Sequence, residues 1–185
     1  SEPSGPLYAL VQQEAFHMPI PQGMRAAFPL ESYHNRMACV VTPDVFGTPA
    51  GYVTIFHEFV HCQQFETCEG KIKASLAVAR KAQAAKDYMW EIDYPFPYQA
   101  VDFTCSYATL LGKHDLADAL EEHRRLKAML GAEDYEYMVW QEWKEGFARF
   151  IENQINQRLD LPLNRGGREP PYDRVTFYAG GAHLI

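Results

Sequence analysis

The sequence is short of features that would assign it to several common classes of protein. Its four cysteines, Cys39, Cys62, Cys68 and Cys105, show no CxxC spacing, which argues against a thiol redox motif and a cysteine zinc knuckle. No apolar run approaches the roughly eighteen residues that span a bilayer, so no membrane-spanning segment is expected. No block rich in lysine or arginine occurs, and the formal net charge is −7. Because nucleic-acid binding depends largely on a basic surface, no nucleic-acid partner is expected either.

The composition is that of a soluble globular protein. Hydrophobic residues make up 47% and charged residues 22% of the 185 residues, as in ordinary folded domains. A chain of this length supports one hydrophobic core rather than two. We therefore expect a single domain over residues 1–185, whose partners are small molecules, peptides or proteins.

The first third of the chain predicts a small sheet followed by a helix. The pattern is irregular from Pro6 to Pro43, where "RMACVVTP" is the best strand because it ends in β-branched residues and a proline. Thr48 can then cap a helix whose first position is Pro49, where the missing N–H costs nothing. We expect this helix to run to Gly70.

Helical patterns dominate the rest of the chain. The segment "DYPFPY" is a proline-broken loop that either lines a pocket or fills a gap between helices. From Leu161 the chain reads as a loop with a short apolar terminus. The expected fold class is α+β, mostly helical, with a small N-terminal sheet. We expect helices over residues 71–90, 99–111, 115–130 and from about 133 to 155.

The stretch "TIFHEFVHCQQFE" places two histidines and a glutamate within the first predicted helix. His57 and His61 are four residues apart, so both side chains project from one face and can bind the same metal ion. Glu58 points about 100° away around the axis and is suited to contact a water on that metal. Chance would produce H-E-x-x-H in a chain of this composition in about two per cent of cases. The apolar residues around the motif indicate a largely buried helix, in which uncompensated histidines would be costly.

A catalytic zinc site also needs a third protein ligand. The third histidine of the metzincin pattern is absent. Cys39 or Cys105 could serve, as cysteine does in peptide deformylases, but the late motif and the E-G-C sequence of those enzymes are missing. The remaining candidate is Glu145 in "WKEGFARFIE", where Gly146 allows close packing against another helix. Two neighbours on this helix, Arg149 and Glu152, either support a ligand by hydrogen bonds or form a surface ion pair, and we expect Glu142 and Lys144 to be solvated.

"HEFVH" followed by "EGFARFIE" resembles the gluzincin group of zinc metallopeptidases, specifically its compact members with an E-G-x-A-x-x-x-E helix. The resemblance covers the two motif helices and implies a zincin-like metalloprotease domain. It implies that His57, His61 and Glu145 bind Zn2+ and that Glu58 is the general base. The N-E-x-x-S-D and G-x-M-E-N motifs of two branches of the group are absent, so the substrate and the cleavage mode do not carry over.

Amide hydrolysis also requires a hydrogen-bond donor for the oxyanion, and in zincins a tyrosine or histidine usually supplements the metal. The C-terminal "FYAGGAH" offers Tyr178 and His183 beside flexible glycines, and Tyr178 is our first candidate because the resemblance also suggests a tyrosine after the glutamate helix. The strand at residues 37–42 could pair with an extended peptide along its free edge, or be merely structural. No function is assigned to the other histidines, His17, His34, His114 and His123.

These expectations combine into one hypothesis with one alternative. The chain is expected to be a zinc metallopeptidase that hydrolyses peptide bonds with a zinc-bound water activated by Glu58. Its partner would be a peptide or protein substrate. The alternative is a non-catalytic, zinc-stabilised binding or regulatory module, which would have no use for Glu58.

Overall fold

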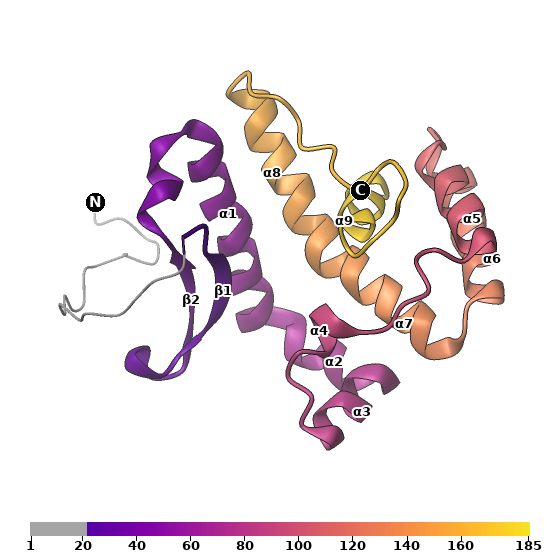
Figure 1. Cartoon of the computed structure of the whole chain (residues 1–185), viewed down its shortest axis with the longest axis horizontal. Coiled ribbons are helices and arrows are strands. Elements are labelled where there is room, and N and C mark those ends of the chain that lie inside the picture. The colour runs from indigo at the N-terminus through magenta and orange to yellow at the C-terminus, as the bar shows by residue number, and fades with distance from the viewer. Residues whose placement is uncertain (1–21) are drawn as a thin grey trace, which may run out of the picture.

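The computed structural model describes residues 22–185, so His17 and the first part of the irregular segment lie outside the described residues. Within this range the chain is mostly helical with a two-stranded sheet (Figure 1). This confirms the α+β, mostly helical class. No helix in residues 22–185 combines the length and the apolar character needed to cross a membrane.

The sheet is an antiparallel hairpin of β1 (Arg25–Leu30) and β2 (Arg36–Val41), in which Ala27 pairs with Cys39. β2 is the predicted strand. The sequence does not predict β1, because "RAAFPL" has no β-branched residue and contains a proline. Both strands pack against α1, which carries the histidine motif.

The first helix, α1 (Pro49–Gln64), begins as predicted, with the Thr48 hydroxyl accepting a hydrogen bond from a first-turn N–H at 3.1 Å. The predicted end at Gly70 is wrong. A π-helical turn, Phe65–Glu69, leads directly into α2 (Gly70–Ser75). A single glycine costs a helix only about 1 kcal/mol, and good helix formers follow this one.

The single helix predicted over residues 71–90 is also wrong. Leu76 has an extended backbone, with ψ of 128°, and separates α2 from α3 (Ala77–Ala85). Lys86 ends α3 with φ of 56°, and a short helix, α4 (Trp90–Asp93), follows. The break allows α3 to direct its own apolar face into the core.

The next helices, α5 (Val101–Leu111) and α6 (Leu116–Met129), lie where the sequence predicts them. The Asp115 carboxylate caps α6 by accepting two first-turn N–H bonds. The region predicted as the last helix contains two helices, α7 (Ala132–Gln141) and α8 (Phe147–Arg158), which are joined by a second π-helical turn. This turn, Glu142–Gly146, carries the predicted metal ligand Glu145.

The C-terminal segment forms α9 (Val175–His183), where the sequence predicts only a loop and a short terminus. Gly180 and Gly181 are buried rather than flexible, since a Cβ on either would collide with Tyr107 or with the backbone of Glu142. Gly146 permits close helix packing as predicted, but its partner is Gly181 of α9. Tertiary packing therefore overrides the low helix propensity of glycine.

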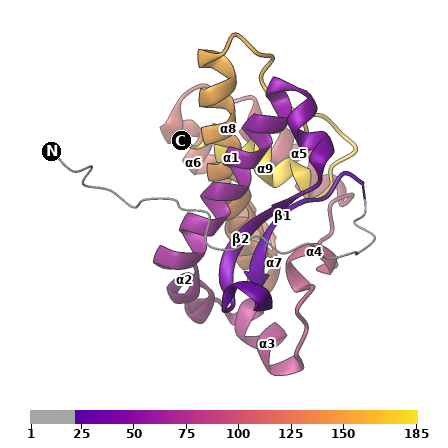
Figure 2. The same cartoon turned by 90° about the vertical axis from the view of Figure 1, so that its left-hand side faces the viewer.

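The elements form successive layers. Figure 1 shows α1 between the sheet and α8, with α5 and α6 farthest from the sheet. α9 packs against α8 and the second π-helical turn. Figure 2, turned by 90°, shows the sheet in front of α1. The histidine motif thus faces α8 from the helix that also supports the sheet.

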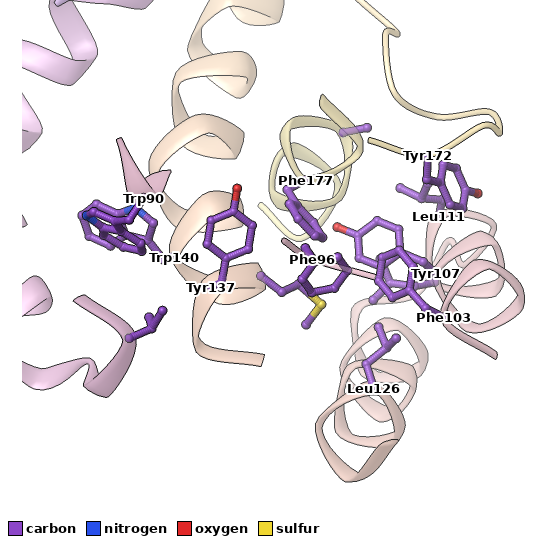
Figure 3. Close-up of a cluster of buried hydrophobic side chains, with 14 of the residues drawn as sticks. Trp90, Phe96, Phe103, Tyr107, Leu111, Leu126, Tyr137, Trp140, Tyr172 and Phe177 are labelled. Atoms are coloured by element: carbon purple, nitrogen blue, oxygen red, sulfur yellow. The ribbon is translucent and has the colours of Figure 1, made fainter. Parts of the chain in front are cut away.

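The main hydrophobic core lies away from the sheet and is rich in aromatic residues (Figure 3). Phe96, in the middle of "DYPFPY", packs against Phe103 and Phe177 with ring centroids about 5 Å apart. This segment therefore fills a gap between helices. Buried aromatic rings contribute both apolar area and favourable edge contacts, so this core anchors α7 and α9, which both pack against the π-helical turn that carries Glu145. Its other large members are Trp90, Tyr107, Leu126, Tyr137, Trp140 and Tyr172.

Candidate metal centre

The three predicted metal ligands lie together in the interior. The Oε2 atom of Glu145 lies 3.6 Å from Nε2 of His57 and 3.2 Å from Nε2 of His61. All three side chains are buried. Among residues 22–185, this is the group of histidine, cysteine and acidic side chains whose donor atoms converge closely enough to hold a metal ion.

The spacing of these atoms fits a small tetrahedral cation. Metal–ligand bonds of about 2.05 Å at tetrahedral angles place neighbouring ligand atoms about 3.3 Å apart. The two measured distances from Glu145 Oε2, 3.6 and 3.2 Å, bracket that value. The donor set of two imidazole nitrogens and one carboxylate oxygen also leaves one tetrahedral position without a protein ligand. The residues present therefore fit a metal ion with an open position.

Each histidine ring is oriented by a hydrogen bond at its other nitrogen. Nδ1 of His57 lies 3.0 Å from Oε2 of Glu152, and Nδ1 of His61 lies 2.9 Å from Oε1 of Gln64. Gln64 in turn donates to the backbone carbonyls of Trp143 and Lys144, beside the third ligand. Such contacts fix the tautomer and leave Nε2 free for a metal. Glu152 therefore orients the ring of His57 and is not part of a surface ion pair. Gln64, one helical turn after His61, orients the ring of His61 in the same way.

Two arginines compensate the buried carboxylates. Nη1 of Arg174 donates to Oε1 of Glu145 at 3.2 Å, which leaves Oε2 of that carboxylate facing the histidines. Nε of Arg149 lies 3.2 Å from Glu152, and its guanidinium donates to the carbonyl of Gly166. The sequence gives no signal for Arg174, because it lies in the segment that reads as a loop. Its contact with Glu145 depends on the fold of α9.

The buried charges shift the titration of the site. Burial lowers the pKa of His57, but the carboxylates of Glu145 and Glu152 outweigh this effect and raise it to about 9. Burial raises the pKa of Glu145, but hydrogen bonds from the histidines and the charge of Arg174 hold it well below its usual range. Glu145 is therefore an anion at neutral pH, as a metal ligand must be.

Glu58 is buried beside the triad, and none of the side-chain hydrogen bonds within residues 22–185 involves its carboxylate. Burial raises its pKa above the usual range, more than the nearby histidines lower it. A carboxylate with a raised pKa in a cleft is a candidate general base. The thiol of Cys39 has its pKa raised to about 12, chiefly by burial, and neither Cys39 nor Cys105 belongs to the metal-ligand group.

Tyr178 lies next to the triad. Its ring stacks on His57 with centroids 6.1 Å apart, and the guanidinium groups of Arg149 and Arg174 lie 5.2 and 5.3 Å from the ring centroid. Burial and the charge of Glu145 raise the pKa of Tyr178, so its hydroxyl stays protonated and can donate. His183 lines a different hollow and is not part of this site.

Two expectations about the surroundings are wrong. The aromatic residues of α1 do not bury the helix: Phe56 and Phe59 are about half exposed, whereas His57, Glu58 and His61 occupy the buried face. The buried polar side chains of His57, Glu58 and His61 are therefore the ones that need hydrogen-bond or charge partners inside the protein. Glu142 and Lys144 are not solvated charges, because both side chains are largely buried and paired; their partners are His123 and Tyr107 for Glu142 and Glu91 for Lys144.

A cleft of about 800 Å³ opens onto the triad and Glu58. All of Arg25–Pro29 of β1 lines it, whereas β2 contributes only Met37. The strand that could pair with an extended peptide beside the metal site is therefore β1, not the predicted β2. The carbonyl of Met24 accepts a hydrogen bond from the Thr42 N–H. In an antiparallel pair, the residues whose backbone groups bond to the partner strand alternate with residues whose backbone groups point away from it. The backbone N–H and C=O groups of Arg25 and Ala27 therefore point away from β2.

No family model, curated protein or solved structure matches this chain.

Proposed function

We propose that this protein is a zinc-dependent metallopeptidase of the gluzincin type, with a zincin-like domain. The observation that carries the proposal is the convergence of His57 Nε2, His61 Nε2 and Glu145 Oε2 in a cleft that Glu58 also lines, with no hydrogen bond to the Glu58 carboxylate from the described part of the chain. Two nitrogen ligands, one oxygen ligand and an open position are the donor set of catalytic zinc in peptidases. A purely structural zinc site usually has four protein ligands and no adjacent base.

When bound, zinc would supply Lewis acidity, lowering the pKa of a coordinated water and polarising the substrate carbonyl. Glu58 accepts a proton from the attacking water and later delivers it to the leaving amine. Its raised pKa suits this exchange, because a base is most effective when its pKa approaches the working pH. The Tyr178 hydroxyl, whose ring is held against His57, Arg149 and Arg174, donates to the developing oxyanion.

The substrate would bind as an extended strand along β1. The outward backbone groups of Arg25 and Ala27 offer hydrogen bonds to a peptide, as in β-augmentation. A strand-like peptide beside β1 would run along the cleft past His57 and Glu58. Backbone pairing of this kind gives affinity without sequence preference, so side-chain selection must come from other parts of the cleft.

The test compares the wild type with Glu58→Gln, using metal analysis together with a peptide library read by mass spectrometry. Glu58→Gln should retain about one equivalent of zinc and lose at least about a hundredfold in cleavage rate, the lower range for general base catalysis. Glu66→Gln, an exposed glutamate just after the same helix, is the matched control and should cleave normally.

Native turnover by Glu58→Gln would contradict the mechanism. Stoichiometric zinc in the wild type without cleavage of any peptide would favour the non-catalytic, zinc-stabilised binding or regulatory module instead.

A further inference from the structure

Large apolar side chains gather at the edge of the cleft. Five of them are between 37% and 84% exposed and line the cleft that contains the metal-ligand triad. They come from three segments that are distant in the sequence: β1, the π-helical turn after α1, and residues 88–92, which lead into α4 and include its Ile92. Scattered exposed apolar residues are normal, but a group around a polar cleft marks a binding surface. We call this group the apolar rim; it consists of Phe28, Phe65, Tyr88, Met89 and Ile92.

The charged groups beneath the rim are already paired with one another. Nζ of Lys73 lies 2.6 Å from both Glu69 and Glu91, and Nζ of Lys144 lies 2.7 Å from Glu91. Their side chains are at most one-third exposed. Two ammonium groups and two carboxylates sum to zero charge, so they offer no net attraction to a charged ligand. A ligand entering this part of the cleft would contact the apolar rim first.

The rim is continuous with the proposed path of the substrate. Phe28 belongs to β1, whose outward edge borders the cleft, and Phe65 directly follows the C-terminal end of α1. The metal ligands His57 and His61 lie one to two turns earlier on the same helix. Figure 1 shows the hairpin end of the sheet, the end of α1 and α4 in the same lower part of the molecule. A peptide along β1 would therefore place a side chain on the rim while its backbone passes the metal site.

We propose that the apolar rim is a specificity subsite that selects a bulky apolar side chain, such as leucine, isoleucine, methionine or phenylalanine, on one side of the scissile bond. This inference rests on the proposed peptidase function and names the substrate class of the same cleft. The recognition is hydrophobic: the rim side chains and the substrate side chain remove each other's apolar surface from water. The open rim admits several shapes of apolar side chain rather than one.

The experiment uses peptide libraries with free and with blocked ends, incubated with zinc-loaded protein, and mass spectrometry to align the cleaved bonds. Wild type should enrich bulky apolar residues about tenfold over alanine at one fixed position, the lower range of discrimination by a hydrophobic pocket. The double variant Met89→Ala with Ile92→Ala should lose most of this enrichment. The matched control, Leu116→Ala with Met129→Ala, changes exposed apolar residues of α6 outside the cleft and should keep it.

A binding measurement separates this inference from the proposed function. Fluorescence anisotropy with zinc-loaded Glu58→Gln protein should give about tenfold tighter binding for a leucine-centred peptide than for its alanine-centred counterpart. Met89→Ala with Ile92→Ala in that background should abolish the difference. If wild type cleaves nothing, the proposed function fails, and these affinities still decide the role of the rim. Enrichment of lysine, arginine or acidic residues, or an unchanged preference in the rim variant, would overturn the inference.

Discussion

Two hollows of nearly equal size use different faces of α1 and α8. The metal-site cleft has a volume of about 800 Å³, and a second hollow, which we call the apolar pocket, has about 760 Å³. The charged groups at the apolar pocket are satisfied: Glu142 bonds to Tyr107 at 2.6 Å and to His123 at 2.7 Å, and His123 also contacts Tyr135. Most of its other lining residues are apolar, among them Val60, Val139, Trp143, Phe147, Ile151 and Leu184.

The difference lies in hydrogen-bonding state rather than in volume. In the cleft, the Nε2 atoms of His57 and His61 point at one carboxylate oxygen, and Glu58 has no hydrogen-bond partner within residues 22–185. In the apolar pocket, a histidine and a glutamate of similar burial saturate each other. Buried polar groups held ready for a further partner indicate chemistry, whereas saturated ones indicate structure.

The largest expected effect separates two glutamates of the same π-helical turn. Glu145→Ala should weaken zinc binding about a thousandfold, because it removes one of three ligands from a binding free energy on the order of 12 kcal/mol. Glu142→Gln should leave zinc affinity unchanged and lower the free energy of unfolding by about 2 kcal/mol, through its bonds in the apolar pocket. Competition with a chromophoric chelator and urea denaturation measure the two quantities. Equal loss of zinc in both variants would erase the distinction between the hollows.

The second effect concerns the pH dependence that arises from His57. In metal-free protein the pKa of His57 is raised from 6.5 to about 9, so its pairing stabilises the fold fully below pH 6.5 and this stabilisation is lost as the pH rises through 9. The loss is on the order of 3 kcal/mol. Zinc affinity should show the opposite slope and increase up to about pH 9, because the metal displaces that proton.

His123 provides the internal control for this pH effect. Burial lowers the pKa of His123, but the hydrogen bond and charge of Glu142 outweigh burial and raise the pKa above its usual value. His123 therefore also contributes to the pH dependence of unfolding. His123→Gln should reduce that contribution and leave the pH dependence of zinc affinity intact. Urea denaturation and chelator competition at several pH values measure both slopes. A zinc affinity that is flat between pH 6.5 and 9 would be incompatible with protonation of His57.

The smallest effect is expected at Gln64, which borders the apolar pocket and bonds to His61. Gln64→Ala should weaken zinc binding between ten- and a hundredfold, the usual range for a residue that orients a metal ligand. Gln63→Ala, at an exposed neighbour lining the same pocket, is the control. Unchanged zinc affinity in Gln64→Ala would assign Gln64 to the apolar pocket alone.

Local signals in the sequence predict the parts of the fold that local chemistry decides. Thr48 and Asp115 cap helices where expected, and the four-residue spacing of His57 and His61 places both rings on one face of α1. The glutamate helix is likewise recognisable, and its Glu145 reaches the histidines. The strand β1 escapes prediction because it is stabilised by its pairing with β2 and its contact with α1, not by its own residues.

The rest depends on packing between distant segments. α9 forms despite two adjacent glycines, because only glycine lets it approach Tyr107 and Glu142. Arg174 becomes a partner of Glu145 only once this helix is in place. The two π-helical turns shift the helical face by one residue each, so the periodicity before them does not predict the burial of residues after them.

The hydrogen bonds of Gln64 have a consequence for how the candidate site would bind a metal ion. Gln64 bonds both to the ring of His61 and to two backbone carbonyls next to Glu145. Hydrogen bonds within the chain therefore already connect the two segments that would supply the ligands. Binding should therefore order few additional residues, and its heat-capacity change should be small, unlike that of a zinc finger, which folds around its ion. The scaffold is preorganised, and metal exchange should proceed by rapid local rearrangement in a chain that stays folded throughout.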